Sequence, residues 1–156
     1  MNEVSKLIDK TITEAVLDST VTSIGDYAFY GCSKLTSVTI GNGVTIIGNY
    51  AFYGCSKLTS VDIPNSVTSI GSFAFNGCSS LKSVTISDSV TGIGRYAFQV
   101  CVSLTSVTVN ATTPPTLGTS AFESTNNCPI YVPAESVDAY KTAWSTYADR
   151  IQAIPS

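Results

Sequence analysis

A block of 23 residues recurs four times along this 156-residue chain, and this repeat constrains the fold more than any other feature. The blocks begin at Val21, Val44, Val67 and Val90 and together span 21–112. The first reads VTSIGDYAFYGCSKLTSVTIGNG, and its glycine, alanine, phenylalanine, cysteine and leucine return at the same places in each later copy. One block is too small to bury its own apolar side chains, so the copies must stack around a shared core. The sequence therefore predicts a solenoid.

Each block has the pattern of a short strand followed by turns. In the segment LTSVTI, Val38 and Ile40 alternate with Thr39, which predicts a strand with one apolar face and one face toward water. A second short strand is expected to end near Ile47, and the segment NYAFYGC that follows is expected to form one helical turn. Stacked copies would align their strands in parallel, about 4.8 Å apart.

The ends of the chain carry degenerate copies, as expected where a solenoid closes its core. A half-repeat begins at Ile12, and Leu117, Gly118, Ala121 and Phe122 resemble the core of the block, so the solenoid is predicted to span 12–132. The whole chain, 1–156, is expected to be a single domain.

Both flanking segments are predicted to be helical caps. Residues 1–11 carry apolar side chains at helical spacing, namely Val4, Leu7 and Ile8. Residues 133–156 begin with a second helical stretch, followed by a small final strand in RIQAI. One face of that stretch is apolar and is expected to cover the last rung, with a ligand site around the tryptophan as the alternative. Its residues are Val137, Tyr140, Trp144, Tyr147 and Ala148.

The pattern I-G-x-x-A-F-x-x-C-x-x-L-x-x-V-x-I, repeated four times, resembles the BspA-like leucine-rich repeats of bacteria and some protozoa. The resemblance covers 12–132, which is most of the chain. It implies the α/β class and a right-handed β/α leucine-rich-repeat solenoid that is rich in β-structure. It also implies a protein that is usually secreted or cell-surface and often linked to adhesion.

Charge and composition argue against several classes of function. Eight Lys and Arg residues are scattered along a chain of net charge −3, whereas a nucleic-acid binder needs a clustered basic patch. No apolar run is long enough to span a bilayer, and the polar residues of MNEVSKLIDKTIT interrupt any signal-peptide core. Histidine is absent, and so are glycine-rich phosphate loops. The chain is therefore expected not to be an enzyme and not to bind a cofactor.

Four of the five cysteines recur at one position of the block, namely Cys32, Cys55, Cys78 and Cys101. The leading interpretation is a column of buried free thiols, because unpaired cysteine packs as a small apolar residue. Disulfides between rungs and a metal site are the alternatives. Zinc motifs space their cysteines two to four apart, not 23. An odd total leaves at least one thiol unpaired in a monomer, which suits a reducing or anaerobic setting.

A solenoid is expected to bind its partner at exposed positions that differ from rung to rung. One such column begins at Asp26 and another at Tyr30, both beside the Ala-Phe core of the predicted helical turn and opposite the main strands. The strand face carries a column of serines and a column of threonines that Asp62 interrupts. This face is either a second hydrogen-bonding surface for a partner or simply a set of β-favouring residues that face water. The predicted partner-binding residues are Asp26, Tyr30, Asn49, Tyr53, Asp62, Asn76, Arg95 and Gln99. A steadier aromatic column, predicted to be structural, holds Tyr27, Tyr50, Phe73 and Tyr96.

The leading functional hypothesis is a non-enzymatic scaffold that binds a protein or glycan, as a bacterial surface or secreted adhesion module. The alternative is an intracellular or phage-associated structural or assembly protein, which a Met1 start without a signal peptide favours. No nucleic acid, membrane insertion, metal or cofactor is expected, and the oligomeric state is expected to be a monomer or weak dimer.

Overall fold

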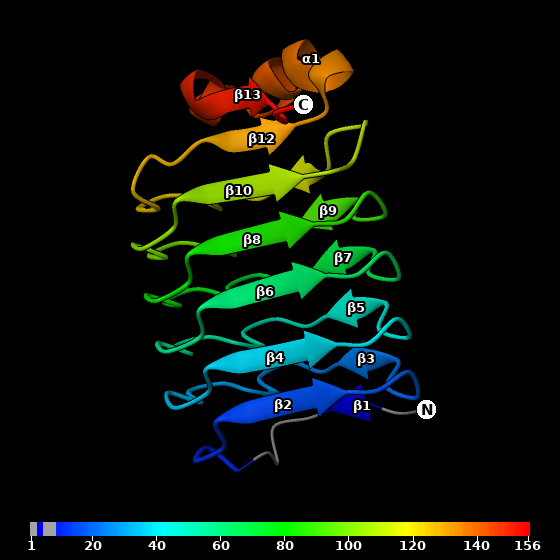
Figure 1. The fold of residues 1–156 in the computed structure, drawn as a ribbon, viewed down its shortest axis with the longest axis vertical. Coiled ribbons are helices and arrows are strands. Elements are labelled where there is room, and N and C mark those ends of the chain that lie inside the picture. Colours follow the sequence, from blue (N-terminus) through cyan, green and yellow to red (C-terminus); the bar gives the residue numbers. More distant parts are fainter. Residues whose placement is uncertain (1–2, 5–8) are drawn as a thin grey trace.

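The computed structural model describes residues 3–4 and 9–156, and it shows a solenoid of stacked rungs (Figure 1). The predicted architecture is confirmed. One side is made of the longer strands, and neighbouring ones in this stack are parallel wherever they pair. These strands are β2 (Glu14–Leu17), β4 (Ser37–Ile40), β6 (Ser60–Ile63), β8 (Ser83–Ile86), β10 (Ser106–Val109), β12 (Ile130–Val132) and β13 (Ile151–Ala153).

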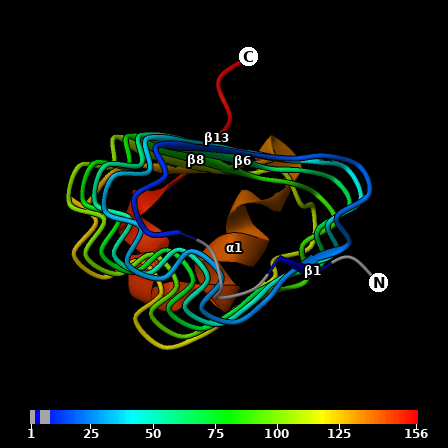
Figure 2. The same cartoon turned by 90° about the horizontal axis from the view of Figure 1, so that it is seen from below.

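A second parallel sheet of two-residue strands runs along the opposite side, and the core lies between the two (Figure 2). Its order, β1-β3-β5-β7-β9-β11, skips one strand at each step because the chain visits the other side in between. The strands are β1 (Glu3–Val4), β3 (Ser23–Ile24), β5 (Ile46–Ile47), β7 (Ser69–Ile70), β9 (Gly92–Ile93) and β11 (Thr116–Leu117).

The register of the sheets equals the repeat of the sequence. Val61 pairs with Val84 and Ile63 with Ile86, so like residues lie above one another. Each column therefore contains nearly identical side chains, and the inward ones are almost all buried. The largest inward column is a stack of phenylalanine rings with centroids 4.9 to 5.4 Å apart and planes within 6° of parallel. Its members are Phe29, Phe52, Phe75, Phe98 and Phe122.

The segment between the short and the long strand is a series of turns, so the expected helical turn is wrong. Alternate N–H groups bond within the rung, as from Ala28 to the Gly25 carbonyl at 3.2 Å. The N–H groups between them bond to the next rung, as from Phe29 to the Ala51 carbonyl at 2.7 Å. Helical N–H groups would all bond along their own axis, so the stacking of rungs overrides the local helical pattern.

A column of glycines allows the rungs to approach closely at the end of the short strands. A Cβ atom added to Gly71 would lie 2.6 Å from the backbone nitrogen of Asn49 and the carbonyl carbon of Gly48. Gly48, Gly94 and Gly118 would meet the preceding rung in the same way, at 2.8 Å or less from its backbone. Because the obstacle is backbone, no side-chain rotation can relieve it.

The C-terminal segment caps the last rung, as predicted. Tyr140 and Trp144 are buried, and each donates a hydrogen bond to a carbonyl of the segment after β10: Tyr140 Oη to Ala111 at 2.7 Å and Trp144 Nε1 to Pro115 at 2.9 Å. Trp144 and Tyr147 also cover the ring of Phe122, which ends the phenylalanine stack. The cap consists of η1 (Ala134–Ser136), α1 (Val137–Ala143), η2 (Ser145–Arg150) and β13.

The N-terminal segment differs from its prediction. Glu3 and Val4 form strand β1, which pairs in parallel with β3, so these residues extend the short-strand sheet instead of starting a helix. Leu7 and Ile8, the other residues of the predicted helical face, lie outside the described residues.

We expect Gly71→Ala to lower the free energy of unfolding by about 2 to 3 kcal/mol, because two rungs must move apart to admit the methyl group. Gly92→Ala is the matched control. Its Cβ would meet only the Thr116 hydroxyl, at 3.3 Å, and Ser69 fills the equivalent position one rung earlier. Urea unfolding of both variants checks the prediction, and equal stabilities would contradict the role assigned to the glycine column.

Candidate functional site

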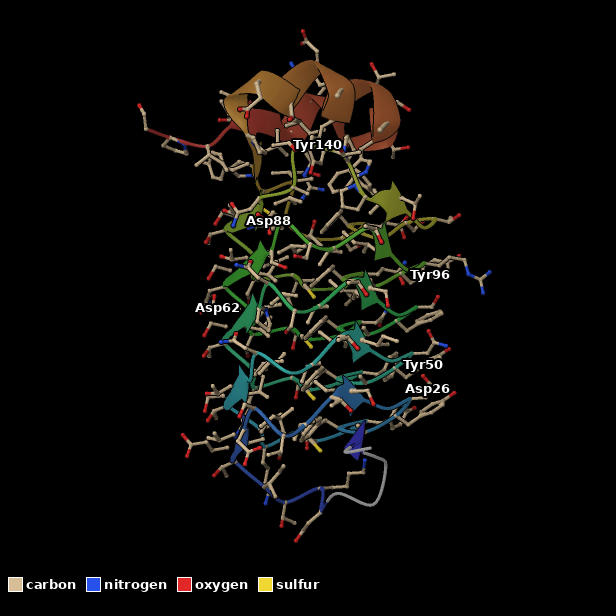
Figure 3. All side chains as sticks on the ribbon, turned by 90° about the vertical axis from the view of Figure 1, so that its right-hand side faces the viewer. Asp26, Tyr50, Asp62, Asp88, Tyr96 and Tyr140 are labelled. Carbon is tan, nitrogen blue, oxygen red and sulfur yellow. The ribbon has the colours of Figure 1, made fainter. Side chains whose placement is uncertain are left out.

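The predicted partner-binding residues lie on two opposite faces of the solenoid. Figure 3 shows Asp62 on the side of the long strands and Asp26, Tyr50 and Tyr96 on the side of the short strands and turns. Asp62 is an exposed residue of β6 and is therefore separated from the others by the core. The eight residues do not form one site, and the turn side carries the larger group.

Two aromatic columns project from the turn side. The inner column, predicted to be structural, stacks Tyr27 on Tyr50 and Tyr50 on Phe73 with centroids 4.9 and 4.7 Å apart and planes within 5° of parallel. The outer column contains Tyr30 and Tyr53, stacked at 5.1 Å. Tilted contacts of 5.5 and 5.4 Å join the two columns within each rung. We call Tyr27, Tyr30, Tyr50 and Tyr53 the tyrosine surface.

The tyrosine surface is partly open to solvent. Tyr27 and Tyr30 are 43% and 39% exposed, and Tyr50 and Tyr53 are half-buried. Lys10 places its Nζ 6.0 Å from the centroid of the Tyr30 ring, which brings a positive charge to the first rung of this surface. Sequence reasoning assigned Tyr27 and Tyr50 to structure alone, whereas the geometry joins them to Tyr30 and Tyr53 in one cluster.

The inner aromatic column has an unusual backbone. Tyr27, Tyr50, Phe73 and Tyr96 all have φ between 58° and 63°, a left-handed conformation that costs a bulky residue about 1 to 2 kcal/mol. Stacking contributes about 0.5 to 1.5 kcal/mol for each aromatic pair, which offsets much of that cost. Every repeat has tyrosine or phenylalanine at this position instead of glycine or asparagine, which is why sequence reasoning missed the conformation.

The outer column changes character after the second rung. Asn76 is only 6% exposed, so its expected place on the surface is wrong. Its Nδ2 donates to the Tyr96 carbonyl at 3.3 Å and to Gln99 Oε1 at 3.1 Å, and Gln99 Nε2 donates to Glu123 Oε1 at 2.7 Å. Amide side chains of the right length can bond to each other down the column. These bonds hold Asn76 away from the surface, whereas Gln99 is half-buried.

The column that begins at Asp26 also has a structural role. Asp26 Oδ1 accepts a hydrogen bond from the backbone N–H of Asn49 at 2.8 Å, and Asn49 Oδ1 accepts one from Ser72 at the same distance. Both side chains nevertheless remain exposed. Arg95 is exposed as well. The candidate surface therefore consists of the tyrosine surface flanked by Asp26 and Asn49, with Arg95 two rungs farther along.

Comparison with known proteins identifies the repeat. A family model described as the BspA type leucine-rich repeat region matches residues 7–129 in six copies. This chain belongs to the BspA-type leucine-rich repeat family. Leucine-rich repeats of this kind typically act as scaffolds for protein interaction. No match was found among curated protein sequences.

Solved bacterial structures share the BspA-type fold. A leucine-rich repeat protein of T. pallidum is 26% identical with a TM-score of 0.76, and the match covers 99% of this chain and 80% of that one. A leucine-rich repeat protein from Eubacterium ventriosum is 34% identical (TM-score 0.71), covering 78% of this chain and 32% of that one. The pneumococcal vaccine antigen PcpA is 20% identical (TM-score 0.69), covering 97% and 38%. The present chain spans about a third of the length of the last two proteins.

The cysteines of this BspA-type repeat are all buried free thiols, the first of the alternatives considered. The Sγ atoms of Cys55, Cys78 and Cys101 each donate to the carbonyl of a phenylalanine in the preceding rung, at 3.2 to 3.3 Å. Burial raises the pKa of Cys55 and of Cys101 to about 12, and it raises the pKa of Cys78 well above its ordinary value of 9.0. The thiols are therefore protonated and poor nucleophiles at neutral pH.

Within the described residues, no group of three or more His, Cys, Asp or Glu side chains is placed to hold a metal ion. In the same part of the chain, no helix has the length and apolar character required to cross a membrane.

We expect the free energy of unfolding to fall as pH rises from about 9 toward 12. Thiols of the unfolded chain ionise near 9, whereas the buried ones keep their protons to a higher pH, so alkali favours the unfolded state. Each such thiol adds a slope of up to about 1.4 kcal/mol per pH unit. Urea unfolding across this range measures the slope. The variant Cys55→Ala/Cys101→Ala should have a shallower one, and an unchanged slope would contradict the assignment.

Proposed function

We propose that this chain is a non-enzymatic binding module of a surface-exposed or secreted bacterial protein, and that it contacts a protein partner through the tyrosine surface. The observation that carries the proposal is the stacked, partly exposed cluster of four tyrosines on two adjacent rungs. A rigid cluster of this kind binds without ordering its own side chains first, which lowers the entropic cost of association. Tyrosine is also enriched among residues that dominate binding energy.

The stacking geometry favours a protein over a glycan as the partner. Sugar rings commonly pack on the open face of an aromatic ring, but here successive rings of each column cover each other's faces at 4.7 to 5.1 Å, so that Tyr50 is covered on both sides. At the first rung, Lys10 lies near the remaining face of Tyr30. The exposed parts are therefore ring edges and hydroxyl groups, which suit the apolar and hydrogen-bonding groups of a protein surface.

Protease treatment of intact source cells, with an antibody against this chain, tests the location. Loss of the antibody signal from unbroken cells, with a cytoplasmic marker left intact, is the result expected of a surface protein. Protection of the chain until the cells are lysed would overturn the surface location unless the chain is recovered from the medium, and it would favour the intracellular or phage-associated assembly role.

We expect Tyr30→Ala/Tyr53→Ala to weaken binding to an immobilised protein partner by about ten-fold or more, because both anchors of the outer column are lost. The partner would first be identified with the wild-type chain on a panel of extracellular matrix proteins and glycans. Surface plasmon resonance measures the change. The melting temperature should fall by about 5 to 10 °C, since the change removes the stack of the two rings and their tilted contacts to Tyr27 and Tyr50, at about 1 kcal/mol for each pair. Binding is therefore measured well below that temperature.

Thr39→Ala/Thr85→Ala is the matched control for this experiment. Both threonines lie on the long-strand face, pointing away from the core. The control should bind like the wild type. Binding lost in the threonine variant but retained in the tyrosine variant would place the interface on the opposite face and contradict the proposal.

A further inference from the structure

The last turn of the solenoid carries backbone N–H groups whose equivalents in the earlier full repeats donate hydrogen bonds to the next rung. In each rung, three alternate N–H groups of the turn segment donate to carbonyls of the rung that follows. The last complete set of these bonds runs from Tyr96 to Thr119 at 3.0 Å, from Phe98 to Ala121 at 2.9 Å, and from Val100 to Glu123 at 3.1 Å. The equivalent donors one rung later are Ser120, Phe122 and Ser124, and no further rung follows them.

The three donors keep the orientation that the repeat imposes. Ser120 and Ser124 have φ of 55° and 59°, close to the 58° and 66° of Tyr96 and Val100 one rung earlier. The N–H of Phe122 donates to the Tyr147 hydroxyl of the cap at 3.1 Å, which confirms the direction of the set. Across residues 3–4 and 9–156, no acceptor bonds the N–H of Ser120 or of Ser124.

The residues that carry these N–H groups lie at a cleft of about 510 Å³ between the last rung and the cap. Both serines line it, together with Thr146, Tyr147 and Arg150 from the cap. The cap covers the ring of Phe122 with Trp144 and Tyr147, but it leaves this space beside the turn open. Backbone N–H groups that a turn leaves without an acceptor are a recognised element of anion-binding sites.

One positive side chain, Arg150, and one negative side chain, Glu123, line the cleft. The Arg150 guanidinium donates to the Cys128 and Phe122 carbonyls at 2.8 and 3.2 Å, but among the described residues no carboxylate lies within ion-pair distance of it. Glu123 lines the same cleft with its oxygens already engaged. Its Oε1 accepts from Gln99 at 2.7 Å and its Oε2 from the Ser120 hydroxyl at 3.4 Å.

We propose that this cleft binds the oxyanion of a small ligand, a carboxylate or a phosphate group. The N–H group of Ser120 or of Ser124 and the Tyr147 hydroxyl donate hydrogen bonds to it, and Arg150 supplies the positive charge. This site is separate from the tyrosine surface and does not depend on the function proposed there.

NMR titration of the ¹⁵N-labelled full chain tests the site, with sodium phosphate and sodium glucuronate as probes and sodium chloride as the ionic-strength control. Saturable shifts of the Ser120 or Ser124 amide signal with at least one probe are expected. Saturation by phosphate alone would identify a phosphate-bearing ligand, and saturation by glucuronate would identify a carboxylate. Shifts no larger than those with chloride, for both probes, would overturn the proposal.

Two charge variants with a matched control sharpen the test. Asn127→Asp places a carboxylate on the wall of the cleft, whereas Asn126→Asp adds the same charge at a neighbouring residue that does not line it. Both asparagines have positive φ, which aspartate tolerates. Asn127→Asp should weaken binding about five-fold or more, and Glu123→Gln should strengthen it. Equal dissociation constants for Asn127→Asp and Asn126→Asp would show a general charge effect and overturn the assigned site.

Discussion

Hydrogen bonds between successive rungs are the constraint on which the rest of this structure depends. They join the long strands, the short strands and the alternate N–H groups of the turns, so every part of a rung has the same axial spacing. Phenylalanine rings then stack at 4.9 to 5.4 Å, and buried thiols reach the carbonyls of the rung before. The glycine column is required because the backbones meet there with no room for a Cβ.

The repeat was sufficient to predict the stacking and the inward columns, because an internal period of 23 residues and an alternating strand pattern report directly on both. It was insufficient for the turn segment. The NYAFYGC pattern is compatible with a helical turn, but bonds to the neighbouring rung compete with helical bonds and win. Glu3 and Val4 likewise pair with β3, a tertiary contact that the local helical spacing does not encode.

Prediction of the candidate site was limited by contacts with neighbouring rungs, as for the turn segment. Variation between rungs pointed to the turn side, where Tyr30 and Tyr53 stack with partial exposure. It also selected Asn76, which is buried because Gln99 one rung away accepts its hydrogen bond. The contribution of Tyr27 and Tyr50 was missed because constancy within a column suggested a purely structural role. This column is constant although Tyr27 is exposed and Tyr50 is half-buried.

The common axial spacing affects how the solenoid can change its number of repeats during evolution. The tyrosine surface lies in the first two full repeats, and the open N–H groups of Ser120 and Ser124 lie beyond the fourth. Duplication or loss of a 23-residue unit between them would leave both surfaces intact and change their separation by one rung, about 4.8 Å. The distance between the two proposed binding surfaces can therefore change only in steps of one rung, and the number of repeats between them sets it.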